Sequence, residues 1–195
     1  MNIEKLIQIT GYILKKYDGI LNYTKLIKIL YLADRKSFSE CGTSITGDVY
    51  VSMKDGPVLC GLYNLIKNRY PDKSIQYYWN SKFQTDRYDL HCAGVYIPTG
   101  KLSDFDMETL DSIDSEFHNY SYSQMIDYVH DKKNCPEWKN TSSSIPLSKS
   151  EILKNIGFSD EDIVSIIEED NLYEEEDKIL ESLNEPVTEE EIYNG

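Results

Sequence analysis

The sequence predicts an α+β protein, consisting of a predominantly α-helical single domain with a small antiparallel β element and an acidic C-terminal extension. Three observations support this prediction. Apolar residues recur at helical spacing in six segments before residue 158. Two segments rich in Tyr, Ile and Val lie between residues 74 and 97, where strands are expected. The charge is divided between a neutral region and a strongly acidic one.

The net charge of −14 is carried entirely by the C-terminal segment. Residues 160–195 contain fifteen acids and one base, whereas residues 1–159 contain nineteen of each. We therefore expect a domain over residues 1–158 and an acidic extension over residues 159–195. Because acidic segments repel phosphates and favour basic partners, nucleic acid is expected to be at most an indirect partner.

The chain contains no run of 18 apolar residues and no apolar segment at its N-terminus, so we expect a cytoplasmic protein without a membrane partner. The cysteines are widely spaced and form no C-x-x-C pair, which predicts reduced thiols in the core. They are Cys41, Cys60, Cys92 and Cys135.

Two helices are predicted at the start of the chain. The first covers residues 3–17, with Asn2 as its cap and Asp18-Gly19 at its end. The second runs from Asn22 to about Cys41 and stops at Gly42. A connection of about four residues predicts that they pack as antiparallel neighbours. The expected buried stripe of the second helix is Leu26, Ile27, Leu30, Tyr31 and Phe38.

A short strand and a third helix are expected next. Residues 48–53 alternate in polarity, which is typical of a strand. The turn Asp55-Gly56-Pro57 follows, and Pro57 suits the first position of a helix because it lacks an N–H. We expect this helix to include Ile66 and to end at Tyr70-Pro71.

The β-prone part of the chain is predicted to form a hairpin or a small antiparallel sheet. Residues 74–79 and 88–97 are its expected strands, with residues 80–86 as a polar connection. The strand at residues 48–53 is a possible third member. Because so few strands are not stable alone, we expect them to pack on the helices.

Three further helices precede the extension, at residues 102–120, 121–130 and 148–157. The last two begin with capping boxes, and residues 132–144 between them are expected to be irregular. Two carboxylate pairs on the first of these helices are interpreted as solvent-facing charges rather than as catalytic acids. They are Asp104 with Asp106, and Asp111 with Asp114.

The extension is the expected partner-binding segment. Its apolar residues fit one or two amphipathic turns, and after Asn171 blocks of acids dominate. Residues 171–195 are expected either to dock as a helix or to become ordered on a partner. The residues expected to bind the partner are Ile163, Ile166, Ile167, Glu174, Glu175 and Glu176.

No catalytic, cofactor-binding or metal-binding residues are predicted, so the protein is not expected to be an enzyme. His91-Cys92, or His130 with Cys135, could be imagined as zinc ligands, but structural zinc sites use four ligands in recognisable pairs. A hydrolase in which Cys92 or Cys135 acts with a histidine is a further hypothesis that a cysteine replacement would test.

The first two helices also carry a group of bases interleaved with tyrosines, which leaves open a nucleic-acid-associated regulator. The simpler interpretation places these bases on the solvated faces of amphipathic helices. They are Lys15, Lys16, Lys25, Lys28, Arg35 and Lys36.

Seven short motifs, taken in order, resemble the Panacea domain of the SocA-like or GepA-like antitoxins. Its usual features are a KLxKLLYxA helix, a Gly-Pro-Val turn before a helix, a Thr-His helix end, a Pro-Trp pair and an Ile-Pro segment. The matching residues here are Leu26–Asp34, Ile45–Asp48, Met53–Val58, Leu62-Tyr63, Tyr128–His130, Pro136–Lys139 and Ile145–Leu147. The resemblance covers about residues 3–157. Asp55 and Val129 depart from the usual pattern.

The resemblance implies a mostly helical, non-enzymatic domain that serves as the antitoxin of a bacterial or phage toxin–antitoxin pair. It implies direct binding of a cognate protein toxin, and it leaves open a second copy of the chain as a further partner. An alternative is a nucleic-acid-associated regulator or a phage-encoded interaction protein without enzymatic activity. The family motif residues, which are structural in this interpretation, are Leu26, Leu30, Tyr31, Gly56, Pro57, Val58, His130, Pro136 and Trp138.

Overall fold

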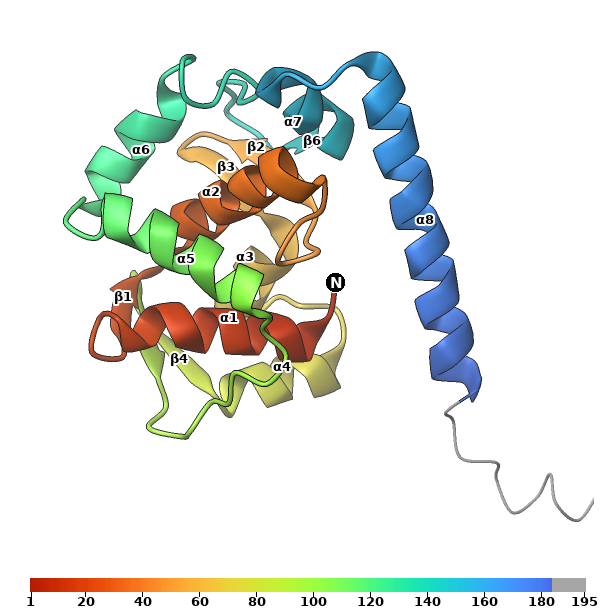
Figure 1. The fold of residues 1–195 in the computed structure, drawn as a ribbon. Helices are drawn as coiled ribbons and strands as arrows, with labels where there is room; N and C mark the ends of the chain where they lie inside the picture. The colour runs from red at the N-terminus through yellow and green to blue at the C-terminus, as the bar shows by residue number, and fades with distance from the viewer. Residues whose placement is uncertain (184–195) are drawn as a thin grey trace, which may run out of the picture. The chain divides into compact units, whose positions relative to one another are not determined.

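The computed structural model describes the backbone of residues 1–183 and the side chains of residues 1–172 (Figure 1). The chain divides into two compact units, Met1–Gly157 and the residues from Phe158 onward. Helices dominate the described residues, and the strands pair only in antiparallel fashion. The predicted helix-rich α+β class is therefore confirmed.

Helix α2 (Tyr23–Cys41) is the centre of the first unit and contacts α5, α6, α7 and strand β3. Asn22 caps its start by accepting hydrogen bonds from the N–H groups of Thr24 and Lys25, and Gly42 ends it with a φ of 73°. Helix α1 (Ile3–Lys15) begins at the predicted Asn2 cap. The caps thus set both helices as predicted, although α1 is two residues shorter.

One three-stranded sheet has the order β3-β2-β6, formed by β2 (Tyr50–Met53), β3 (Gly56–Leu59) and β6 (Ile145–Leu147). Here the prediction for Pro57 was wrong, because this residue lies in β3 opposite Ser52 and the helix begins only at Cys60. Proline is tolerated since β3 is an edge strand of the sheet. Strand β6 was not predicted.

The other sheet has the order β1-β5-β4, formed by β1 (Ile20–Asn22), β5 (Asp89–Cys92) and β4 (Phe83–Asp86). A hairpin was predicted in this part of the chain, but its first strand was misplaced, because β4 lies within residues 80–86, the expected connection. Strand β5 falls within the expected strand 88–97, and the segment at residues 48–53 belongs to the other sheet. The strand predicted over residues 74–79 was wrong, because α4 (Lys73–Asn80) occupies this position. Asp72 caps α4 and overrides the strand preference of its tyrosines.

The remaining helices of this unit are α3 (Cys60–Ile66), α5 (Asp104–Phe117), α6 (Tyr122–His130) and α7 (Lys149–Ile156). The boxes at Ser121 and Ser148 form as predicted. Two carboxylates of α5 are not solvent-facing, which corrects the prediction. Asp106 closes a capping box with Ser103 and pairs with Lys5, while Asp114 is buried beside His118.

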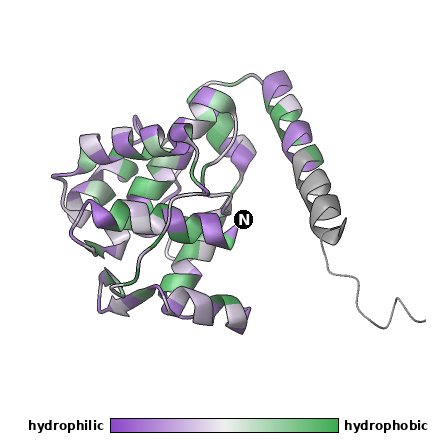
Figure 2. Ribbon diagram, turned by 60° about the horizontal axis from the view of Figure 1, so that its bottom comes forward, coloured by the Kyte–Doolittle hydropathy of each residue, from purple (hydrophilic) through white to green (hydrophobic). Residues whose placement is uncertain are grey.

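The core lies around α2 and is built from its apolar residues together with those of the helices around it. Figure 2 shows apolar and polar residues alternating along the helices of this unit, as amphipathic packing requires. The largest side chains that are fully buried include Trp79, Tyr31, Lys28, Phe38 and Phe83. One of these is a lysine, which the helical pattern had placed among the solvated bases.

The second unit contains α8 (Asp160–Leu183), whose first turn is acidic. Ser159 and Asp162 exchange hydrogen bonds at its start, which satisfies N–H groups that have no helical partner. No helix among the described residues is long and apolar enough to span a membrane.

Candidate functional site

The family motif residues gather around the inner half of α2. All nine are buried or half-buried, so they act first as a framework. The amine of Lys28 lies among these residues and donates a hydrogen bond to the carbonyl of Pro57 at 2.7 Å. Gly56 has a φ of 109°, and a Cβ at this position would lie 2.6 Å from Val129 of α6. The Gly-Pro turn therefore lets β3 approach both α2 and α6 closely.

A buried carboxylate joins α2 to the segment that follows α6. Glu137 accepts hydrogen bonds from the Tyr31 hydroxyl at 2.6 Å and from the Arg35 guanidinium at 2.8 Å, both through Oε1. Burial and then the charge of Glu137 raise the pKa of Tyr31 well above its usual value. Oε2 of Glu137 is buried and has no hydrogen-bond partner among the described residues.

An aromatic stack fixes the end of α6. The rings of His130 and Trp138 lie 3.9 Å apart and nearly parallel, and the Trp138 indole donates to the carbonyl of Met53 at 2.9 Å. Lys132 lies over the indole and donates to the Trp138 carbonyl. Burial, followed by the charge of Lys28, lowers the pKa of His130, which favours the neutral imidazole.

Burial shifts the pKa values of a thiol and of an amine in this framework. Burial raises the pKa of the Cys135 thiol to about 12, which disfavours the thiolate that a nucleophile needs. Burial also lowers the pKa of Lys28 to about 7, and its amine donates a hydrogen bond to the main-chain carbonyl of Pro57. Within the described part of the chain, no group of three or more His, Cys, Asp and Glu side chains could hold a metal ion.

The cysteines are all free, but the prediction that all four lie in the core was wrong. Cys135 is buried, Cys60 and Cys92 are half-buried, and Cys41 is exposed at the end of α2. At the surface, the Cys41 thiol lies within hydrogen-bond distance of the Ser37 and Thr43 hydroxyls.

The bases of the first two helices do not form a common surface, which corrects the interpretation of these residues as a solvated cluster. Lys25 and Lys28 are buried, and Lys25 donates to the His118 carbonyl at 2.6 Å. Lys16 and Lys36 each form an ion pair, with Asp111 and Glu40. Most of the bases that suggested nucleic-acid binding are therefore either buried or paired with acids.

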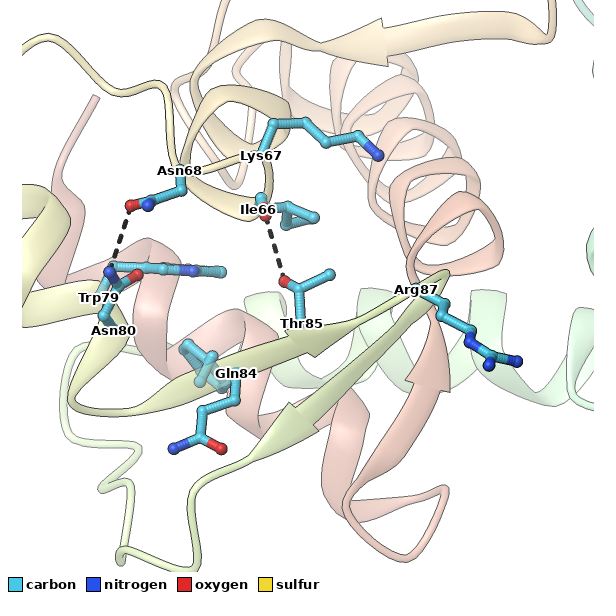
Figure 3. Close-up of a pocket in the computed structure, with 9 residues that line it drawn as sticks. Ile66, Lys67, Asn68, Trp79, Asn80, Gln84, Thr85 and Arg87 are labelled. Carbon is cyan, nitrogen blue, oxygen red and sulfur yellow. Dashed lines mark hydrogen bonds between the residues drawn. The ribbon is translucent and has the colours of Figure 1, made fainter.

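A cavity of about 530 Å³ lies between the end of α3, α4 and the β4–β5 hairpin (Figure 3). Trp79 and Phe83, with ring centroids 4.4 Å apart, lie in its wall and are 1% exposed. Thr85 donates to the Ile66 carbonyl at 3.1 Å, which ties the hairpin to α3. All the residues that line the cavity fall within residues 66–92, and we call this segment the hairpin surface. This surface was not predicted, because residues 74–79 had been interpreted as a strand.

The residues expected to bind a partner lie on α8. Ile163, Ile166 and Ile167 are spaced by three and four residues, so they share one side of the helix. Ile163 is buried, however, and Ile166 and Ile167 are half-buried, so only the latter two are partly open to a partner. The backbone of Glu174, Glu175 and Glu176 continues the helix, but their side chains lie outside the described residues, as does the structure of residues 184–195.

Two functional features could not be found by inspecting the pattern of the sequence. Lys28 stands between Ile27 and Ile29 in α2, and these apolar neighbours are the only feature of the sequence that indicates its burial. The ion pair between Arg35 and Glu137 joins residues 102 positions apart, which no local spacing reveals.

Comparison with known proteins gives one match. A family model described as antitoxin SocA-like, Panacea domain, matches residues 26–139, which is more than half of the chain. The matched range contains α2 from Leu26 onward, the Gly-Pro turn, α6 and the Pro136–Lys139 segment, so it includes the framework described above. No curated protein and no solved structure gives a significant match.

Proposed function

The chain belongs to the family of SocA-like antitoxins with a Panacea domain, and from this membership we propose that it neutralises a protein toxin by binding it directly. The observation that carries the proposal is the family match, which covers the complete buried framework around α2. The cognate toxin is the proposed partner. We further propose that the pair is encoded by a bacterium or a phage and acts in the cytoplasm, where the free thiols would stay reduced.

We propose that the protein acts by binding and not by catalysis. Its polar groups that could take part in chemistry are used to hold the framework together. The Lys28 amine is held by a backbone carbonyl, the Cys135 thiol is buried with a raised pKa, and the His130 ring is stacked on Trp138. A stable framework of this kind leaves the surface free to differ between family members that meet different toxins.

The acidic extension is proposed as a part of the chain that contacts the toxin. Residues 160–195 carry a net charge of −14, and the half-buried Ile166 and Ile167 add apolar side chains to α8. An acidic helix that also carries apolar side chains suits a basic toxin surface, because opposite charges steer the encounter and apolar side chains then stabilise the complex.

Coexpression tests the proposal. The product of the reading frame next to the gene is expressed alone and together with this chain in a bacterial host. We expect growth to stop when the neighbour is expressed alone and to resume with the pair, and we expect the two proteins to copurify. A neighbour that is harmless alone, or that stays lethal with this chain present, would contradict the proposal.

A further inference from the structure

Arg87 occupies an unusual backbone conformation at the tip of the β4–β5 hairpin. Its φ is +52°, a value that L side chains other than Asn and Asp rarely adopt. Gly or Asn is the usual residue where a two-residue hairpin loop needs a positive φ. Because glycine would fold more easily here, the arginine side chain is expected to serve a purpose other than folding.

Arg87 and Lys67 both line the cavity of the hairpin surface. Figure 3 shows Lys67 extending from the end of α3 and Arg87 from the hairpin tip, on the same side of the view. The Lys67 amine lies 4.1 Å from the centre of the Tyr23 ring and contacts its hydroxyl. Within the described residues, neither cation has a carboxylate at ion-pair distance.

The composition of the hairpin surface differs from that of the whole chain. Residues 66–92 contain five bases and three acids, in a chain with a net charge of −14. One of these acids, Asp72, is used to cap α4. Tyr77, Tyr78 and Tyr88 are 78%, 42% and 66% exposed. These tyrosines lie outside the lining of the cavity itself. Exposed Tyr and Arg side chains are typical of protein-binding surfaces.

The side chains around the cavity are held in place before any partner arrives. Asn80 donates to Asn68 at 3.3 Å, and Gln76 donates to Asn80 at 2.9 Å and to the Leu65 carbonyl at 3.0 Å. A surface that is already ordered loses little conformational entropy when it binds.

From these observations we propose that the hairpin surface binds an acidic segment of the toxin, with Arg87 and Lys67 pairing with its carboxylates. A guanidinium binds a carboxylate through two parallel hydrogen bonds, so Arg87 would fix the orientation of the segment. The adjacent tyrosines would cover the apolar parts of the same segment. This inference rests on the proposed function, because it identifies the toxin as the partner.

An acidic protein segment fits this surface better than a nucleic acid. A duplex meets many phosphates at once and is repelled by the net charge of the whole chain, whereas a short segment meets only the local cations.

The test measures folding stability and toxin affinity in the same full-length variants. Arg87→Gly removes the side chain and relieves the backbone, so we expect its melting temperature to rise by about 2–4 °C. The toxin, separated from the copurified complex in denaturant and refolded, should bind this variant at least tenfold more weakly than wild type. The matched control is Asp18→Gly, because Asp18 is exposed with a φ of +53° but lies outside the hairpin surface. It should gain less stability than Arg87→Gly, because Asp adopts a positive φ more readily than Arg, and it should bind like wild type.

Charge reversal provides a second comparison. Arg87→Glu should weaken binding more than Arg87→Gly and should lose most of its effect at high salt, whereas Lys101→Glu, at another exposed base, should bind like wild type. Equal affinity of wild type and Arg87→Glu would overturn the assignment of this surface. A labelled DNA duplex that binds wild type at low micromolar concentration, but not Arg87→Glu, would overturn it in favour of nucleic acid. Failure of wild type to bind the toxin would instead contradict the proposed function itself.

Discussion

Tyr31 donates a hydrogen bond of 2.6 Å to Glu137, and this buried contact joins two family motifs that lie 106 positions apart. We expect Tyr31→Phe and Glu137→Gln to be non-additive, with a coupling free energy of about 1 kcal/mol or more from urea unfolding. The control is the exposed hydrogen bond between Tyr12 and Asp111, where the cycle of Tyr12→Phe and Asp111→Asn should give less than about 0.5 kcal/mol. Equal coupling in both cycles would contradict the framework role of Glu137.

Gly56 is expected to tolerate no side chain. Its positive φ strains any other residue, and a Cβ would lie 2.6 Å from Val129 Cγ2 and 3.0 Å from Lys28 Cε. We expect Gly56→Ala to lower the free energy of unfolding by at least about 3 kcal/mol. Gly157→Ala isolates the backbone cost, because Gly157 has a φ of 115° and no atom within 4 Å of the added Cβ. It should cost only about 1–2 kcal/mol, and similar losses in both variants would show that the close packing is unimportant.

Asp34 ties the loop after α2 to the core through four hydrogen bonds. Its Oδ1 accepts from the N–H groups of Ile45 and Thr46, and its Oδ2 from the hydroxyls of Thr46 and Tyr50. Asp34→Ala should cost about 2–5 kcal/mol, because it leaves two buried N–H groups without acceptors. Asp34→Asn should cost much less, since its oxygen can serve both N–H groups and the hydroxyls can rotate to accept from the amide. Thermal unfolding distinguishes the two, and the reverse order would refute this account.

Lys28 should make stability depend on pH. Burial lowers its pKa from 10.5 to about 7, so above pH 7 the unfolded chain holds a proton that the folded chain has released. The free energy of unfolding should therefore rise between pH 7 and about 8.5, and the stabilisation should be complete only above the unfolded pKa. Above this range the Cys135 thiol, with a pKa raised to about 12, acts in the opposite direction.

The comparison uses urea unfolding of wild type, Lys28→Met and Lys15→Met. Lys15 is exposed, so its replacement should leave the rise with pH unchanged, whereas Lys28→Met should remove most of it. A rise of the same size in Lys28→Met would show that another group is responsible.

Deleting the residues after Gly157 should weaken the complex with the toxin, most strongly at low salt. Two full-length variants separate the sources of affinity. Changing Glu174, Glu175 and Glu176 to Gln should reduce the salt dependence, and changing Ile166 and Ile167 to Ser should weaken binding at every salt concentration. Neutralisation by the shortened chain that equals that of the full chain would show that the extension has no such role.

Local signals predicted the helices well because their ends are set by nearby residues. Asn2, Asn22, Ser103, Ser121 and Ser148 each cap a helix with a hydrogen bond that spans two or three positions. The same kind of signal was overlooked at Asp72, where the tyrosines and isoleucine of residues 74–79 favoured a strand. Gln76 and Trp79 turn toward the core with helical spacing, which a strand would not allow.

The candidate site was only partly predictable, since its key contacts connect distant segments. The motifs identified the framework, but the burial of Lys28 depends on the carbonyl of Pro57, and Pro57 had been assigned to a helix. Strand β6 is three residues long, so it could be recognised only through its pairing with Tyr50–Ser52. The hairpin surface required the correct fold of residues 73–92 before its cations and tyrosines could be placed together.

Strand β6 also determines when the protein can fold during synthesis. The sheet stays incomplete until Ile145–Leu147 have been made, and α7, which contacts α2, follows directly. The unit ends at Gly157, so every residue of the framework and of the hairpin surface is made before the acidic segment. The order of synthesis thus places the residues of the scaffold ahead of those of the charged arm.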